Sequence, residues 1–110
     1  MYSLGVPELP ATALDADAVL VDVRQPGEWA AGHIESAAHI PMGEVTSRLA
    51  ELPEGAPLYV ICRSGSRSAR VVEYLRSHGI NAVNVAGGMQ DWAASGKPMV
   101  SDTGRAPEVI

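Results

Sequence analysis

Residues 58–68 read Leu58-Tyr59-Val60-Ile61-Cys62-Arg63-Ser64-Gly65-Ser66-Arg67-Ser68, and they join an apolar run to the start of an amphipathic helix. The apolar run 58–62 has the character of a strand buried on both faces of a parallel sheet. After it, Ala69, Val72 and Leu75 recur at every third position, which predicts a helix over 68–79 that ends at Gly79. A strand that passes directly into a helix is the unit from which α/β folds are built.

Similar but shorter patterns lie on both sides of this unit. Further strands are predicted at 18–22, 37–40 and 82–86, with an edge strand near 2–6. Further helices are predicted at 25–31, 44–52 and 88–95. Strands that alternate with helices predict an α/β sandwich of three layers, in which helices cover both faces of a parallel sheet. In such folds the active site lies at the carboxyl ends of the strands.

The length and composition fit a single folded domain. The chain has 110 residues, of which 46% are hydrophobic and 19% are charged, so wholesale disorder is ruled out. We expect residues 1–98 to form the domain. Residues 99–110 show little apolar periodicity, and we expect them to be a flexible C-terminal tail.

Several absences in the sequence bear on where the protein works. No apolar run approaches the ~18 residues of a membrane span. The first residues lack the basic flank and the long apolar stretch of a secretory signal. The single cysteine, Cys62, excludes an internal disulfide and any multi-cysteine metal site. These features predict a soluble, cytoplasmic domain that has no membrane partner.

The charges are distributed unevenly along the chain. The formal net charge is −5, which makes nucleic acids and anionic membranes poor candidate partners. Residues 63–76 reverse this balance, because they contain four arginines and the single acid Glu73. The arginines are Arg63, Arg67, Arg70 and Arg76. A local cluster of this kind on an acidic protein is either a solvated helix face or a site for a small anion.

The loop after Cys62 favours the second interpretation. Gly65 permits backbone angles that point several N–H groups into the loop, and the N-terminus of the next helix adds partial positive charge. Arg63 and Arg67 lie on either side of this glycine. All of these features favour the thiolate form of cysteine. We therefore predict Cys62 as a nucleophile, with an anion-binding loop formed by Arg63, Ser64, Gly65, Ser66 and Arg67.

Three thiolate chemistries are open: phosphoryl transfer, sulfur transfer and redox sensing. A phosphatase loop has five residues between its cysteine and its arginine, whereas four separate Cys62 from Arg67. The smaller ring suits one bound sulfur atom. A redox switch usually needs a resolving thiol, which this chain lacks. We predict neither a cofactor nor a metal, because His33, His39 and His78 lack metal-ligand spacing.

Other polar residues near the predicted site have simpler interpretations. Asp22 and Arg24 end a predicted strand, and we expect them to hold neighbouring loops together by hydrogen bonds. His33 is interpreted as a structural hydrogen-bonding residue. Trp29 and Trp92 are expected to pack in the core or in a lid.

Three ordered motifs extend the pattern beyond the loop. They are Val21-Asp22-Val23-Arg24 through Ala38-His39-Ile40-Pro41, Cys62 through Ser68, and Gly87-Gly88 through Gly96-Lys97-Pro98. In this combination the chain resembles the single-domain rhodaneses, or thiosulfate sulfurtransferases, over roughly residues 4–98. The resemblance implies a parallel sheet of about five strands flanked by helices.

The resemblance also implies a reaction. A small anionic donor such as thiosulfate would give its outer sulfur to Cys62, and an acceptor would take it from the resulting persulfide. The acceptor would be cyanide or a thiol, either a small molecule or a protein. Two alternatives remain open at this point. One is a phosphatase or arsenate reductase that shares the fold, and the other is a non-enzymatic sulfur carrier or regulatory module.

Overall fold

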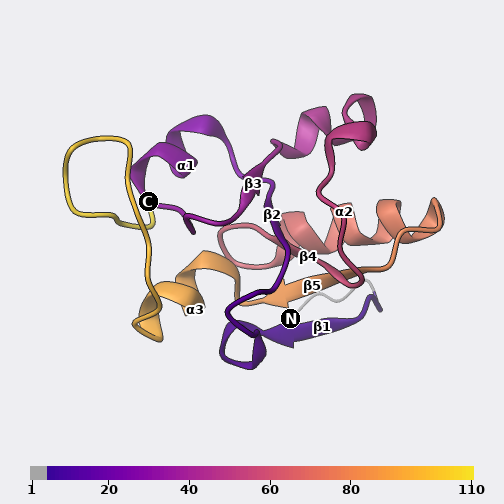
Figure 1. Cartoon of the computed structure of the whole chain (residues 1–110), viewed down its shortest axis with the longest axis horizontal. Coiled ribbons are helices and arrows are strands. Elements are labelled where there is room, and N and C mark those ends of the chain that lie inside the picture. The colour runs from indigo at the N-terminus through magenta and orange to yellow at the C-terminus, as the bar shows by residue number, and fades with distance from the viewer. Residues whose placement is uncertain (1–4) are drawn as a thin grey trace.

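The computed structural model describes residues 5–110, and its centre is one five-stranded sheet. The strand order is β1-β5-β4-β2-β3, and every neighbouring pair is parallel. The strands are β1 (Glu8–Pro10), β2 (Leu20–Asp22), β3 (Ala38–His39), β4 (Leu58–Ile61) and β5 (Ala82–Ala86) (Figure 1). The α/β class and the parallel sheet predicted from the sequence are confirmed. The edge strand predicted near 2–6 falls partly outside the described residues, and the edge strand of the structure is β1.

Three α-helices follow strands β2, β4 and β5. They are α1 (Pro26–Ala31), α2 (Ser66–Ser77) and α3 (Gly88–Ala94). Residues 5–110 also contain three short 3₁₀ helices, η1 (Ala11–Ala13), η2 (Met42–Ser47) and η3 (Leu49–Glu51). Helix α2 starts two residues earlier than predicted, and its N-cap is Gly65.

The α-helix predicted over 44–52 is wrong in type, because η2 and η3 occupy this segment. Its hydrogen bonds span three residues, as in Arg48 N–H to Val45 O (3.1 Å) and Leu52 N–H to Leu49 O (3.2 Å). Gly43, Thr46 and Ser47 are weak helix formers, so the segment takes 3₁₀ turns between two prolines. The apolar stripe that motivated the prediction still packs against the core, through Val45, Leu49 and Leu52.

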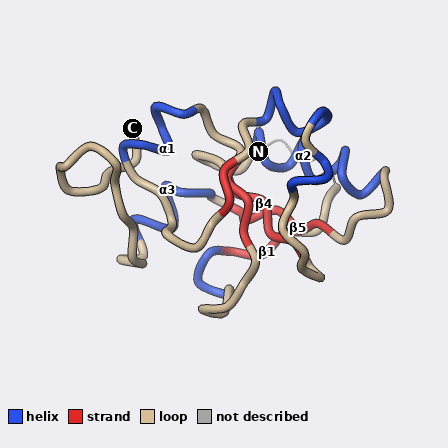
Figure 2. Tube along the Cα trace, turned by 45° about the horizontal axis from the view of Figure 1, so that its top comes forward, coloured by secondary structure: helices blue, strands red, loops and turns tan. Residues whose placement is uncertain are grey.

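The sheet separates two hydrophobic cores, one on each face. Successive residues of a strand face opposite sides of the sheet, so Val60 joins one core while Ile61 joins the other. Helix α2 and η2 cover the first face through Val72, Leu75 and Val45, and α3 and η1 cover the second through Met89, Trp92 and Ala11. Figure 2 shows the strands at the centre with helices on both sides. This is the predicted three-layer arrangement.

Strand register places three loops at one edge of the sheet. Asp22 pairs with Ile61 across β2 and β4, and Val60 pairs with Asn84 across β4 and β5. The loops that follow β2, β4 and β5 therefore meet at the carboxyl ends of the strands. Cys62 is the first residue after β4, at the middle of this edge.

The segment 99–110, expected to be a flexible tail, runs along α1 and is hydrogen-bonded to its end (Figure 1). Val100 exchanges two backbone hydrogen bonds with His33 (2.8 and 2.9 Å), and the Glu108 N–H donates to Ala31 O (2.9 Å). Val109 packs against the second core. Because these contacts use mainly backbone groups, the apolar periodicity of the segment could not reveal them. Among residues 5–110, no helix is long and apolar enough to cross a membrane.

Candidate active site

Cys62 lies at the end of β4 with its side chain inside the domain, where it is only 1% exposed. Two donors lie within hydrogen-bonding distance of its sulfur: the Gly65 N–H at 3.1 Å and the Ser68 hydroxyl at 3.2 Å. A sulfur with these two neighbours at the start of α2 is placed to carry negative charge. The structure thus brings the predicted nucleophile and the middle of the predicted loop together.

The turn at Gly65 makes this arrangement possible. Its φ of +109° lies in a region that residues with a Cβ rarely adopt, and a Cβ here would lie 3.3 Å from the Gly87 nitrogen. No side chain caps α2, so the amides of its first turn have no side-chain acceptor at the N-cap. Ser64 and Ser66 are exposed on the outside of the loop.

Helix α3 supports the loop from behind. Its Met89 N–H donates to Cys62 O (2.8 Å), and its Gln90 N–H donates to Arg63 O (3.0 Å). Gly88 permits this approach, because its φ is +55° and a Cβ would meet Cys62 O and lie 2.7 Å from Arg63 O. In the sequence, Gly87-Gly88 stood out only as the start of the third motif, and the contact with the Cys62 loop was not predicted.

A buried polar network on the α2 side was also missed. The Ser68 hydroxyl lies 2.6 Å from Asn84 Oδ1, and Asn84 Nδ2 donates to Gly65 O (3.1 Å) and to Glu8 Oε2 (3.3 Å). Ser68 is 0% exposed and Asn84 is 2% exposed. The available signal was Asn84 itself, a polar residue at the centre of the apolar run of β5. It ties the loop to β5 and β1.

Arg67 is bound by a residue to which the sequence assigned no role. Its Nη1 and Nη2 donate to the two carboxylate oxygens of Glu28, each at 2.8 Å, so the pair is bidentate. The hydrogen bond from Arg67 is the largest influence that lowers the pKa of Glu28, to about 2, and the same bond raises the pKa of Arg67. Arg67, predicted to bind a donor, is therefore already engaged by α1.

Arg63 is exposed and points toward the C-terminal segment. Its Nε donates to the backbone oxygen of Ile110 (2.8 Å). The Gln90 carboxamide is satisfied when its oxygen faces the guanidinium, 3.0 Å from Nη1. Within residues 5–110, no side-chain carboxylate forms an ion pair with Arg63.

Asp22 and Arg24 form a buried ion pair beside the loop, both 0% exposed. Arg24 Nη2 donates to Asp22 Oδ2 (2.7 Å) and to Gly32 O (2.7 Å), so the pair holds the loops after β2 and α1, as predicted. His39 Nε2 lies 2.8 Å from Arg24 O, and the Trp29 ring stacks on both His33 and His39. Arg24 Nη1 also donates to Glu28 O (3.3 Å), which connects the buried pair to α1.

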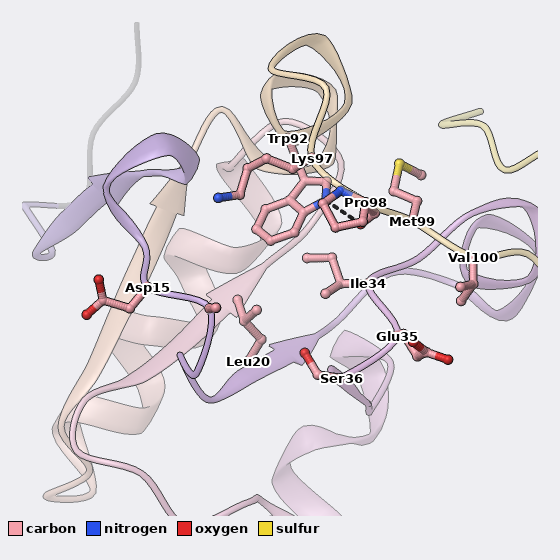
Figure 3. A pocket seen from close by; sticks show the side chains of 11 residues that line it. Asp15, Leu20, Ile34, Glu35, Ser36, Trp92, Lys97, Pro98, Met99 and Val100 are labelled. Carbon is pink, nitrogen blue, oxygen red and sulfur yellow. Dashed lines mark hydrogen bonds between the residues drawn. The ribbon is translucent and has the colours of Figure 1, made fainter.

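A cavity of about 380 Å³ lies away from this site, at the amino ends of β2 and β3. Leu20, Ile34 and Trp92 line it, together with Lys97, whose ammonium lies 4.7 Å from the centre of the Trp92 ring (Figure 3). No residue of the Cys62 loop lines this cavity, so the contacts around the sulfur, and not cavity volume, define the candidate site. Residues 5–110 contain no group of His, Cys, Asp and Glu side chains placed to hold a metal ion.

Comparison with known proteins agrees with this architecture. Residues 7–95 match the family described as the rhodanese-like domain. The chain belongs to the rhodanese-like family. A crystal structure of a rhodanese-related protein from Thermoplasma volcanium superposes with a TM-score of 0.71 at 38% identity, and the match covers 76% of this chain and 83% of that one.

Several curated proteins similar to this chain come from Bacillus subtilis (strain 168), and two of them are described by function. The putative sulfurtransferase YtwF is 42% identical over 76% of this chain and 82% of its own length. The putative sulfur carrier protein YrkF is 39% identical over 80% of this chain and 51% of its own length. The first match spans most of both proteins, whereas in YrkF the matching part is about half of the protein.

Proposed function

We propose that this protein is a sulfurtransferase in which Cys62 carries a sulfane sulfur as a persulfide between a donor, such as thiosulfate, and a thiol or cyanide acceptor. The observation that supports this most directly is the pair of donors around the Cys62 sulfur, the Gly65 N–H and the Ser68 hydroxyl. Sulfurtransferase as the general class also fits the rhodanese-like domain and the relative named as a putative sulfurtransferase.

The first half-reaction loads the cysteine. The Cys62 thiolate attacks the outer sulfur of thiosulfate, so that a bond forms between the two sulfurs and the S–S bond of the donor breaks. Sulfite leaves as a dianion with the bonding electron pair, and Cys62 becomes Cys–S–S⁻. The outer sulfur of this persulfide carries negative charge, and the amides of loop 63–67 and of the first turn of α2 are proposed to stabilise it.

The second half-reaction unloads it. A thiolate or cyanide attacks the outer sulfur, the bond between the two sulfurs breaks, and the Cys62 thiolate is regenerated. With cyanide the product is thiocyanate, and with a thiolate it is a new persulfide. Neither half-reaction needs a proton shuttle or a metal, which suits a loop built from amides and hydroxyls. A thiol that must cycle in this way suits a reducing compartment, and we propose the cytoplasm.

The alternatives differ in what the loop must do. A phosphatase needs its loop arginine free to hold phosphoryl oxygens, whereas Arg67 is bound by Glu28 in a loop that is one residue shorter. A redox switch usually needs a second cysteine as a partner, and this chain has only Cys62. A non-enzymatic sulfur carrier remains the second candidate, because the chain is similar to YrkF and a carrier would use the same persulfide.

Intact-mass spectrometry tests the proposal. Thiosulfate or cysteine persulfide in excess should add one sulfur atom to the protein, a reductant should remove it, and Cys62→Ser should stay unmodified. With the donor still in excess, addition of cyanide should release thiocyanate over many cycles if the protein is an enzyme, and not beyond one equivalent if it is a carrier. An unmodified Cys62 with both donors would overturn the persulfide itself.

A further inference from the structure

The contact between Glu28 and Arg67 bears on which sulfur donor the site accepts, an inference that rests on the proposed persulfide function. Glu28 is held in place before any donor arrives. Its Oε1 accepts from the Gln25 N–H (2.9 Å) in the capping box of α1, and both of its oxygens accept from Arg67 (2.8 Å each). Its side chain is 16% exposed and that of Arg67 is 29% exposed, so water screens the pair only in part.

The charges around the sulfur follow from these contacts. Arg67 follows Cys62 by five residues in the same loop; its pKa is raised chiefly by the hydrogen bond to Glu28, and to a smaller extent by the Cys62 thiolate. The Glu28 carboxylate, however, already neutralises Arg67. Arg63 is the one other guanidinium of the loop, and no side-chain carboxylate of residues 5–110 pairs with it. The loop therefore offers one cation that no side-chain carboxylate of residues 5–110 neutralises, and this cation already donates to Ile110 O (2.8 Å), on a protein of net charge −5.

Donors differ in how much positive charge they need. Thiosulfate is a dianion, and the sulfite that leaves is also a dianion. Sulfur transfer from thiosulfate therefore brings two negative charges close to the thiolate. A persulfide, R–S–SH, has a reacting end with at most one negative charge. The Cys62 thiolate attacks its outer sulfur, the S–S bond of the donor breaks, the thiolate RS⁻ leaves with the bonding pair, and Cys62 becomes Cys–S–SH. Total charge stays the same, and one cation is enough.

We propose that Glu28 is a specificity-determining residue: by holding Arg67 in a bidentate ion pair, it makes the loop a poor site for dianionic thiosulfate and a better one for persulfide donors. The proposal covers persulfides of small thiols and of proteins alike, since the reacting end is chemically the same in both.

Glu28→Gln tests the proposal, because glutamine keeps an acceptor for the Gln25 N–H while it removes the charge. We expect kcat/KM with thiosulfate to rise about tenfold, which corresponds to about 1.4 kcal/mol. With cysteine persulfide we expect it to change less than about twofold. Persulfidated serum albumin serves as the protein donor, and faster transfer from albumin or from cysteine persulfide identifies the source.

Two control variants make the result decisive. Glu51→Gln removes the same charge from an exposed ion pair with Arg48 and should leave kcat/KM unchanged with thiosulfate and with cysteine persulfide. Arg67→Ala in the Glu28→Gln background should cancel the gain with thiosulfate. Suppose that Cys62 of Glu28→Gln is still loaded, as intact mass would show, but kcat/KM with thiosulfate is unchanged or lower. This result would overturn only the role of Glu28 and leave the proposed function standing. If none of these donors loads Cys62, the proposed function is overturned as well.

Discussion

The hydroxyl oxygen of Ser68 lies 3.2 Å from the sulfur of Cys62, and Ser68 is fully buried. The same oxygen lies 2.6 Å from Asn84 Oδ1 and 3.2 Å from Gly65 O. A hydroxyl has one proton, so it donates to only one of these acceptors at a time. An anionic acceptor attracts the proton more strongly than a neutral one, so ionisation of Cys62 should turn the hydroxyl from Asn84 to the sulfur.

Ser68→Ala should therefore slow the alkylation of Cys62 by iodoacetamide at neutral pH roughly tenfold, since a hydrogen bond to a charged group contributes about 1.5–3 kcal/mol and water recovers part of it. Asn84→Ala is the matched control, because it disturbs the same network but keeps the hydroxyl, which then has only the sulfur and Gly65 O as acceptors. It should not slow alkylation. Equal rates in Ser68→Ala and the unmodified sequence would show that the hydroxyl does not support the thiolate.

The buried pair of Asp22 and Arg24 should be important for stability. Arg24→Ala leaves the Asp22 carboxylate buried without its cation and removes the hydrogen bond to Gly32 O. Breaking such a pair costs about 3–5 kcal/mol. For a domain of this size this should lower Tm by at least about 10 °C in a thermal unfolding experiment.

Arg48→Ala is the control for this experiment. Arg48 also pairs with two carboxylates, but those of Glu44 and Glu51 are 54% and 57% exposed, so water can solvate them when Arg48 is removed and the change in Tm should be small. Similar losses in the two variants would mean that burial does not distinguish the pairs.

Much of the fold was predictable because each strand is short, apolar and closed by a turn or a charge. The run Leu58–Ile61 carries its own evidence of burial on both faces, and the i, i+3 pattern of Ala69, Val72 and Leu75 specifies the face of α2 that packs on the sheet. The type of helix at 42–51 was not predictable from the apolar stripe, because Val45 and Leu49 can face the core from either a 3₁₀ or an α-helix.

The candidate site was predictable only where its residues are neighbours in sequence. Cys62, Gly65 and Arg67 belong to one loop, so their proximity follows from the chain itself. The partners Glu28, Asn84 and Gly88 come from α1, β5 and the start of α3, and they reach the loop only through the sheet order. The spacing of residues in the sequence does not show which distant segments meet in the fold, so the ion pair of Arg67 and Glu28 could be found only in the structure.

Gly88→Ala should disrupt the site more than a comparable change elsewhere. The new Cβ would meet Cys62 O and the backbone of Arg63, none of which is a flexible side-chain end, and φ is +55°. We expect a loss of stability together with a loss of Cys62 alkylation and loading. Gly79→Ala is the control, since its φ is +78° but nothing lies within 4 Å of the new Cβ. It should cost about 1–2 kcal/mol in stability and leave Cys62 reactivity unchanged.

The ion pair of Glu28 and Arg67 should make stability depend on acid pH. The pKa of Glu28 falls from the usual 4.5 to about 2 in the folded protein, chiefly because Arg67 donates to its carboxylate. A carboxyl with a lowered pKa binds protons more readily when unfolded, so its contribution is complete above about pH 4.5 and is lost as the pH falls toward about 2. At neutral pH, Glu28→Gln should therefore melt at a lower temperature than the unmodified sequence. The difference should shrink steadily between pH 4.5 and pH 2 when both are followed by circular dichroism. A difference in Tm that stays constant over this range would show that the Glu28 carboxylate does not stabilise the fold through its charge.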